Sequence, residues 1–332
     1  MKDRRGYDGV VPGFVQRFLT AIQLTRLTIA FGAVSDIWFV ILITKANVEY
    51  NYLPVFALPL GVALLSGAVV AIGLFAYGAS LNDVLDVRHD AAFSPDRPIP
   101  AGRIRAGQAV VVTVGALIVA VLGAAGLGMW SVCITLLAAA GLLFYNAAGK
   151  FIPAVGILTI GLIHAAHMLI PNYQLTFTLP VWFVMTHAMA IATAVHVLED
   201  KRPRFRRRSV LVMVLGWCIW SVLILGVGTL PDGSMWPEGA SWSGIIYPLL
   251  AVIAFLAMAW WKVSVVPGKV AAEKLKRYGA MWQSLYGAMW LLGLGLVVEA
   301  MWIGLFAIAG FTAMTLIKEV SGLTGRPIEY RA

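Results

Sequence analysis

Long apolar segments recur along almost the whole chain, and they constrain its fold more than any other feature. An α-helix needs roughly 20 apolar residues to cross a bilayer, and these segments are close to that length. Within lipid the backbone polar groups must be satisfied inside the structure, and helices are the open-ended way to do this. The sequence therefore predicts an all-α integral membrane protein with many crossings.

The apolar pattern predicts nine membrane spans, and the length of its last apolar segment predicts a tenth span. The segment 280–317 is too long for one simple crossing, so we expect a break near Glu299, the only formal charge in it. No polar block of domain size interrupts the pattern, which favours one membrane domain over residues 1–332. The expected spans are 18–44, 54–81, 108–127, 129–145, 152–171, 178–198, 210–229, 244–261, 280–298 and 301–317.

Charge placement predicts the orientation of this bundle. Hydrophobic residues make up 60% of the chain and charged residues 12%, which is too apolar for a soluble domain. With the N-terminus inside, the basic loops, including 82–107 and 199–209, are cytoplasmic and only Lys45 is left outside.

The MKDRRGYDG start has no signal-peptide core, so we expect no cleaved leader. The net charge of +9 is then a topology signal, and nucleic-acid binding is set aside. In a bacterium the protein would be a multi-pass protein of the inner membrane.

An acidic stretch follows the second expected span. If the helix continues through NDVLDVRHD, an arc of about 100° holds four oxygen-bearing side chains: Asn82, Asp83, Asp86 and Asp90. Carboxylates this close repel one another in a partly dry site, and oxygen ligands at this spacing suit Mg²⁺. Such a Mg²⁺ completes its shell with water and phosphate oxygens, which makes a diphosphate the natural partner. The alternative is a solvated loop, although acids are mildly unfavourable at a helix C-terminus.

This motif, together with the proline-stiffened loop PDRPIPAGR that follows it at 95–103, resembles the first signature of the UbiA superfamily of intramembrane prenyltransferases. The resemblance implies nine or ten helices around a central cavity and a prenyl diphosphate bound through Mg²⁺. The allylic diphosphate would ionise, and the prenyl cation would alkylate a lipophilic acceptor such as an aromatic ring. Metal and basic residues would stabilise the leaving diphosphate while a dry cavity keeps water from the cation.

The same resemblance assigns roles to individual residues. Asn82, Asp83, Asp86 and Asp90 take the position of the first metal site. Lys150 matches a lysine that holds diphosphate after the fourth helix, although a positive-inside anchor is the alternative. Arg26 lies where family members often carry an arginine near the cytoplasmic mouth, and Arg97 in the proline-rich loop would add positive charge. Snorkelling to the interface is the alternative for Arg26.

The second signature, an Asp-x-x-x-Asp after the sixth helix, is altered to HVLEDKRPR. In the preferred register Asp200 is the first acid, His196 replaces an Asn and Arg204 replaces the second Asp. In the other register Asp200 is the second acid. On a continuous helix His196, Asp200 and Arg204 share one face, so Asp200 ranks above Glu199 as a metal ligand. A carboxylate is missing in both registers, and Arg204 could instead contact the diphosphate as a permanent positive charge.

Ionisable residues within the spans predict a polar lining, because such groups usually face a cavity or a partner at membrane depth. Asp36 could bind a polar group of an acceptor or pair with a histidine. His164 and His167 share one face at spacing i, i+3, and His187 lies in the next span. Zinc is disfavoured because no third ligand is evident. A polar patch facing the cavity is the preferred interpretation.

Three hypotheses follow. The first is a Mg²⁺-dependent prenyltransferase that joins a prenyl diphosphate to a lipophilic acceptor in the bilayer. The second is a UbiA-type terpene cyclase, in which the cation closes on itself without an acceptor. The third is a non-catalytic lipid-binding or transport protein. A CDP-alcohol phosphotransferase is excluded because its Asp-Gly-x-x-Ala-Arg pattern is absent.

Overall fold

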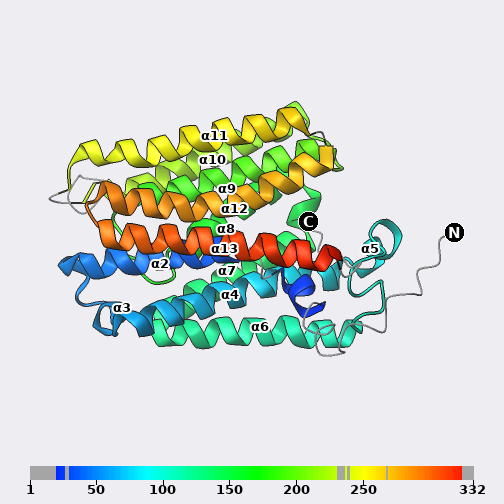
Figure 1. The fold of residues 1–332 in the computed structure, drawn as a ribbon, viewed down its shortest axis with the longest axis horizontal. Coiled ribbons are helices and arrows are strands. Elements are labelled where there is room, and N and C mark those ends of the chain that lie inside the picture. The colour runs from blue at the N-terminus through cyan, green and yellow to red at the C-terminus, as the bar shows by residue number, and fades with distance from the viewer. Residues whose placement is uncertain (1–19, 27–29, 230–235, 238–239, 267, 324–332) are drawn as a thin grey trace.

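The computed structural model describes residues 20–26, 30–229, 236–237, 240–266 and 268–323, and all regular structure in them is helical. The long helices are α2 (Phe31–Ala46), α4 (Leu60–Leu85), α6 (Ala106–Leu127), α7 (Met129–Ala147), α8 (Pro153–Met168), α9 (Leu179–Leu198), α10 (Arg207–Thr229), α11 (Ile246–Val265), α12 (Gly268–Gly293) and α13 (Val297–Leu323). Shorter elements are η2 (Val48–Tyr50), α3 (Pro54–Ala57), α5 (Val87–Phe93), η3 (Gly149–Phe151) and η4 (Trp242–Ile245). The long helices lie side by side along the longest axis of the molecule, with α11 and α6 at its two edges (Figure 1).

Within the described residues, seven helical segments are long and apolar enough to cross a membrane. They are Leu60–Leu85, Ala106–Leu127, Met129–Ala147, Leu179–Leu198, Arg207–Thr229, Trp242–Val265 and Val297–Ile317. The apolar α8 is shorter, with 16 residues, as is α2. The protein is therefore a multi-pass membrane protein. A count of nine or ten spans stays a prediction, which requires α2, α8 and α12 to cross as well.

In the described part of the chain, helices far apart in sequence close into a ring. Helix α2 packs on α4, α4 on α7, α7 on α8, α8 on α9, α9 on α12, and α12 packs back on α2. Outside this ring, α6 packs on α4 and α7, α10 on α8 and α9, and α11 and α13 on α12. These outer helices leave large apolar side chains such as Leu122, Val222 and Ile253 exposed, as a lipid-facing surface requires. The ring brings the ends of α4, α7 and α9 together.

The helix boundaries differ from the expected spans at several places, and α12 begins twelve residues before the expected span 280–298. The first span is interrupted by a turn at Arg26, and α2 begins at Phe31. The second is broken at Pro59, which precedes α4 and cannot donate a backbone hydrogen bond. The break expected near Glu299 lies at 294–296, where Gly295 has a φ of 79°. Glu299 lies instead in the first turn of α13, where the helix dipole favours a negative charge.

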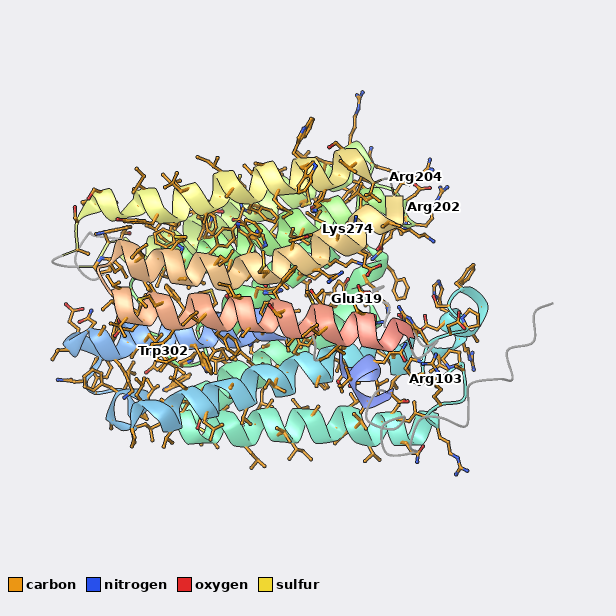
Figure 2. All side chains as sticks on the ribbon, in the orientation of Figure 1. Arg103, Arg202, Arg204, Lys274, Trp302 and Glu319 are labelled. Atoms are coloured by element: carbon orange, nitrogen blue, oxygen red, sulfur yellow. The ribbon has the colours of Figure 1, made fainter. Side chains whose placement is uncertain are left out.

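The two ends of the bundle differ in their side chains. Arg103, Arg202 and Arg204 lie at one end of the molecule, whereas Trp302 lies nearer the other end (Figure 2). Helix α5 is at the same end as the arginines (Figure 1). The basic loops therefore gather on one side of the bundle, as the sequence predicts. Their cytoplasmic location stays a prediction.

Close packing of α4 on α6 depends on Gly73. A Cβ atom at this position would lie 2.7 Å from the backbone nitrogen of Ala120 and 2.9 Å from the carbonyl oxygen of Ala116. Gly73→Ala should therefore force the two helices apart and destabilise the protein by about 1–3 kcal/mol, measured as a lower midpoint of thermal unfolding in detergent. Gly115→Ala on α6 is the matched control, because its Cβ would meet nothing within 4 Å. Equal effects of the two substitutions would contradict the prediction.

Candidate functional site

The first acidic motif lies where α4 meets α5. Helix α4 ends at Leu85, and Asp86 forms the joint with φ −92° and ψ 8°. The backbone N–H of Asp86 donates to the carbonyl of Asn82, and that of Asp90 donates to the carbonyl of Asp86. The chain thus keeps a helical path, but the single helix expected through Asp90 is wrong because it is interrupted at Asp86. The carboxylates consequently take separate partners.

Two arginines neutralise the buried carboxylates of this motif. Oδ1 of Asp83 accepts hydrogen bonds from Nη2 of Arg26 at 3.0 Å and from Nη1 of Arg97 at 3.4 Å. Nη1 of Arg97 also donates to Oδ2 of Asp90 at 2.7 Å. Both carboxylates are buried and need such partners. Arg26 adopts a left-handed φ of 51°, a strain of about 1–3 kcal/mol that is characteristic of functional positions.

Asp86 is bound differently, by Lys150 from η3. Nζ of Lys150 lies 2.6 Å from both carboxylate oxygens of Asp86 and 3.4 Å from Oδ1 of Asn82. The side chain of Asp86 is 21% exposed, whereas that of Asp83 is 4% exposed. Among the described residues, the buried Nδ2 of Asn82 has no hydrogen-bond partner. Asn82 and Asp86 are one helical turn apart and direct their oxygens at the same cation.

The second motif does not continue α9. This helix ends at Leu198, and Asp200 has a left-handed φ of 47°. The argument that His196, Asp200 and Arg204 share one helical face is therefore wrong. Oδ1 and Oδ2 of Asp200 accept hydrogen bonds from Arg204 at 2.8 and 2.9 Å, and both side chains are more than half exposed. The hydrogen bond from Arg204 lowers the pKa of Asp200. Nε2 of His196 lies 3.1 Å from the carbonyl oxygen of Pro203.

Glu199 is the carboxylate that this turn directs inward. Its side chain is 10% exposed, and it pairs with Nζ of Lys276 at 2.8 Å and with Nζ of Lys201 at 3.2 Å. Burial alone would raise the pKa of Glu199, but the two ammonium groups outweigh it and hold that pKa below its ordinary value. Lys276 comes from α12, 77 residues further along the chain. Sequence reasoning missed this lysine because it lies between the expected spans 244–261 and 280–298, whereas α12 extends through it.

Tyr145, near the end of α7, connects the two motifs. Its hydroxyl lies within electrostatic reach of Arg26 and Asp86 from the first motif and of Glu199 from the second. Lys276 in turn lies within electrostatic reach of Arg26. The two polar helix ends therefore lie within electrostatic reach of one another. Glu199 and Lys276 occupy the place that the sequence assigned to Asp200 and Arg204.

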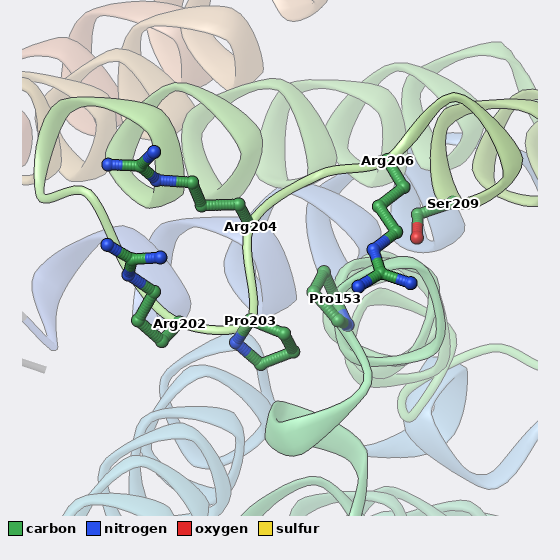
Figure 3. Close-up of a pocket in the computed structure, with 6 residues that line it drawn as sticks. All are labelled: Pro153, Arg202, Pro203, Arg204, Arg206 and Ser209. Atoms are coloured by element: carbon green, nitrogen blue, oxygen red, sulfur yellow. The ribbon is translucent and has the colours of Figure 1, made fainter.

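A surface hollow of about 640 Å³ adjoins the second motif, and its lining residues are Pro153, Arg202, Pro203, Arg204, Arg206 and Ser209. Figure 3 shows that Arg202 and Arg204 extend from their loop away from Arg206 and Ser209. The guanidinium groups therefore do not converge on one point. Arg204, expected to bind diphosphate, is instead engaged by Asp200 at this surface.

Comparison with models of protein families shows the family of this chain. The model described as "UbiA prenyltransferase family" matches residues 37–286, which is most of the chain. The chain belongs to the UbiA prenyltransferase family. The resemblance drawn from the first acidic motif is thereby confirmed.

Individual UbiA relatives are distant. Over 82 residues the chain is 35% identical to digeranylgeranylglyceryl phosphate synthase of Saccharolobus solfataricus, and the match spans 25% of this chain and 29% of that protein. A solved structure described as digeranylgeranylglyceryl phosphate synthase in membranes has a TM-score of 0.55 and 18% identity, and covers 84% of this chain and 98% of its own. A UbiA homologue from Archaeoglobus fulgidus bound to Cd²⁺ has a TM-score of 0.41 and 15% identity, over 89% of this chain and 99% of its own. The first of these structures shows that the chain shares the fold of that synthase.

The oxygen ligands of this UbiA site fit a magnesium ion at one point. Within the described ranges, no group of three or more His, Cys, Asp or Glu side chains could hold a metal. Asp83 and Asp90 are satisfied by arginines, but the oxygens of Asp86 and Asn82 already converge on a cation, the ammonium of Lys150. Mg²⁺ typically takes one or two protein carboxylates and completes its shell with water and phosphate oxygens. Metal binding by Asp83, Asp90 and Asp200 stays a prediction and requires their arginine partners to move.

Proposed function

We propose that this protein is an intramembrane prenyltransferase that ionises an allylic prenyl diphosphate with Mg²⁺ and transfers the prenyl group to a lipophilic acceptor. One observation carries the proposal: Asp86, Asn82 and Lys150 converge at the end of a ring of apolar helices. Membership of the UbiA prenyltransferase family supports it.

Charge balance explains why a divalent ion is needed. Arg26 and Arg97 are paired with Asp83 and Asp90, and Lys276 is paired with Glu199. These basic side chains are therefore already neutralised by carboxylates of the protein. A bound diphosphate brings further negative charge into a partly buried site, where it must be compensated. Mg²⁺ held by Asp86 and Asn82 would supply that charge and stabilise the leaving diphosphate.

The remaining groups bind and orient the diphosphate. Lys150 is accessible enough to exchange its contact with Asp86 for a phosphate oxygen, and Arg26 can present its guanidinium beside it. The bond between the prenyl carbon and the diphosphate oxygen breaks, and the diphosphate leaves with the electron pair. The acceptor then bonds to that carbon and loses a proton. Apolar side chains inside the helix ring would keep water from the cation.

The name of the Saccharolobus relative supports transfer over cyclisation. Digeranylgeranylglyceryl phosphate is by its name a glyceryl phosphate that carries geranylgeranyl groups, so that enzyme's product contains an acceptor. For the present chain we therefore place an acceptor ahead of intramolecular closure of the cation.

Diphosphate release tests the proposal. The full chain, purified in detergent, is incubated with prenyl diphosphates of several lengths and a panel of lipophilic acceptors. We expect release that depends on Mg²⁺, is abolished by EDTA, and yields a prenylated acceptor. A cyclic hydrocarbon or alcohol formed without acceptor would show a cyclase instead. Absence of release with every substrate and metal condition would favour the non-catalytic hypothesis.

A further inference from the structure

A hydrogen bond joins two helices of the ring, α8 and α12, across its interior. Nε2 of Gln283 on α12 lies 3.1 Å from Nδ1 of His164 on α8. An amide nitrogen only donates, so Nδ1 of His164 accepts and the proton of the neutral ring is on Nε2. Gln283 therefore fixes the tautomer of His164. His164 lies about 16 Å along α8 from Pro153, given the rise of 1.5 Å per residue.

The fixed proton has no acceptor in the part of the chain that the structure describes. Nε2 of His164 makes no hydrogen bond to any described residue. His164 also keeps part of its surface open, although α8 is packed against α2, α7, α9 and α10. Since its ring reaches across to α12, the open surface faces the inside of the ring. An N–H donor in such a place is unfavourable unless another molecule accepts its hydrogen bond.

An unpaired acceptor lies in the same layer of the bundle. Helix α2 touches Gln283 at Gly32, where a Cβ atom would lie 3.3 Å from Oε1 of Gln283. Asp36 follows Gly32 by one helical turn on the same face. It is 3% exposed, and Oδ2 of Asp36 is buried without a hydrogen-bond partner among the described residues. We call His164, Gln283 and Asp36 the interior polar layer.

His187 on α9 is an example of an imidazole in this bundle whose two nitrogens both have hydrogen-bond partners. Nε2 of His187 lies 3.2 Å from the carbonyl oxygen of Gly279, and Nδ1 lies 3.4 Å from the hydroxyl of Tyr286. Both nitrogens of His187 therefore have partners on α12. His164 differs because one nitrogen remains available, so the interior polar layer is not merely a set of self-satisfied core groups.

From these contacts we infer that the interior polar layer binds a hydroxyl group of a lipophilic ligand. A hydroxyl can accept from Nε2 of His164 and donate to Oδ2 of Asp36, so it matches both unpaired groups. His164 lies about three helical turns along α8 from Pro153, which closely follows the η3 element that carries Lys150, so this hydroxyl is not the reacting atom. A prenyl chain is a hydrocarbon, which identifies the ligand as the acceptor. That identification rests on the proposed function.

Direct binding tests the inference without catalysis. The full chain in detergent, without prenyl diphosphate or Mg²⁺, is titrated with 4-nonylphenol and with its methyl ether, and the midpoint of thermal unfolding gives the affinity of each. The methyl ether cannot donate a hydrogen bond to Asp36. The wild-type protein should bind the phenol about tenfold more tightly than the ether. Asp36→Leu should bind both with affinities within about twofold of each other, whereas His164→Leu should weaken the binding of both, because either oxygen can accept from Nε2.

Thr159→Val is the matched control on the same helix, because the hydroxyl of Thr159 is satisfied by the carbonyl oxygen of Val155 at 2.8 Å. It should keep the preference for the phenol. If Asp36→Leu fails to fold, His164→Leu still tests the inference, since it should weaken the binding of both ligands about fivefold to tenfold. Equal binding of phenol and ether by the wild type, a preference retained in Asp36→Leu, or unchanged binding of both ligands by His164→Leu overturns the inference. Absence of diphosphate release would count against the proposed function and leave this preference unaffected.

Discussion

Asp86→Asn should lower diphosphate release and prenyl transfer by about a hundredfold to a thousandfold, the range found when one preorganised charge-stabilising group is removed from an active site. Asp86 is the one carboxylate of the first motif that faces a lysine rather than an arginine, and its side chain is 21% exposed. An amide in its place keeps the shape but loses the negative charge that holds a cation beside Asn82. Activity is measured as diphosphate release at saturating Mg²⁺.

The fold should survive this substitution, because the site is partly accessible and Lys150 can turn toward water. The midpoint of thermal unfolding in detergent checks that point. Glu49→Gln is a matched loss of one carboxylate, in the exposed η2 element, and should leave activity within about twofold of wild type, since exposed polar pairs contribute little. Full activity in Asp86→Asn would remove the proposed metal site.

The first half of the site could be predicted from the sequence because its contacts are mostly set by short-range order. Asn82 and Asp86 are one helical turn apart, and Arg97 follows Asp90 after a proline-stiffened loop. Lys150 reaches Asp86 from 64 residues away, and it was found through the resemblance to a family rather than through spacing. The pairing of each carboxylate with its own cation could not be predicted, because it depends on the joint at Asp86.

The second half was predicted less well, and the cause is local backbone geometry. The register argument assumed that α9 continues through Arg204, but the helix ends at Leu198 and Asp200 takes a left-handed conformation. Because of this turn, Glu199 faces the interior and the adjacent Asp200 lies at the surface. Lys276 was out of reach of the sequence because its contact with Glu199 depends on α12 packing against α9.

Glu199 and Asp200 therefore form a natural comparison of neighbouring carboxylates. Glu199→Gln should lower the kcat/KM for prenyl diphosphate by about a hundredfold, whereas Asp200→Asn should change it by less than about threefold. Glu199 compensates Lys276, whose side chain is 15% exposed. Without that charge the ammonium of Lys276 is buried and uncompensated, so it either loses its proton or turns away from the site. Both outcomes remove positive charge near Arg26, which in the proposed function contacts the diphosphate.

Asp200 makes no such contribution, because its bond to Arg204 is at the surface, where water screens the charges. The measurement is a full set of kcat and KM values for wild type and both variants, with thermal unfolding to confirm that each folds. A mainly structural role for Glu199 would lower the unfolding midpoint without a selective rise in KM for the diphosphate. If Asp200→Asn proves to be the more damaging change, Asp200 must turn inward when substrate binds. The register that the sequence favours would then describe the loaded enzyme, and the inward orientation of Glu199 would be confined to the free protein.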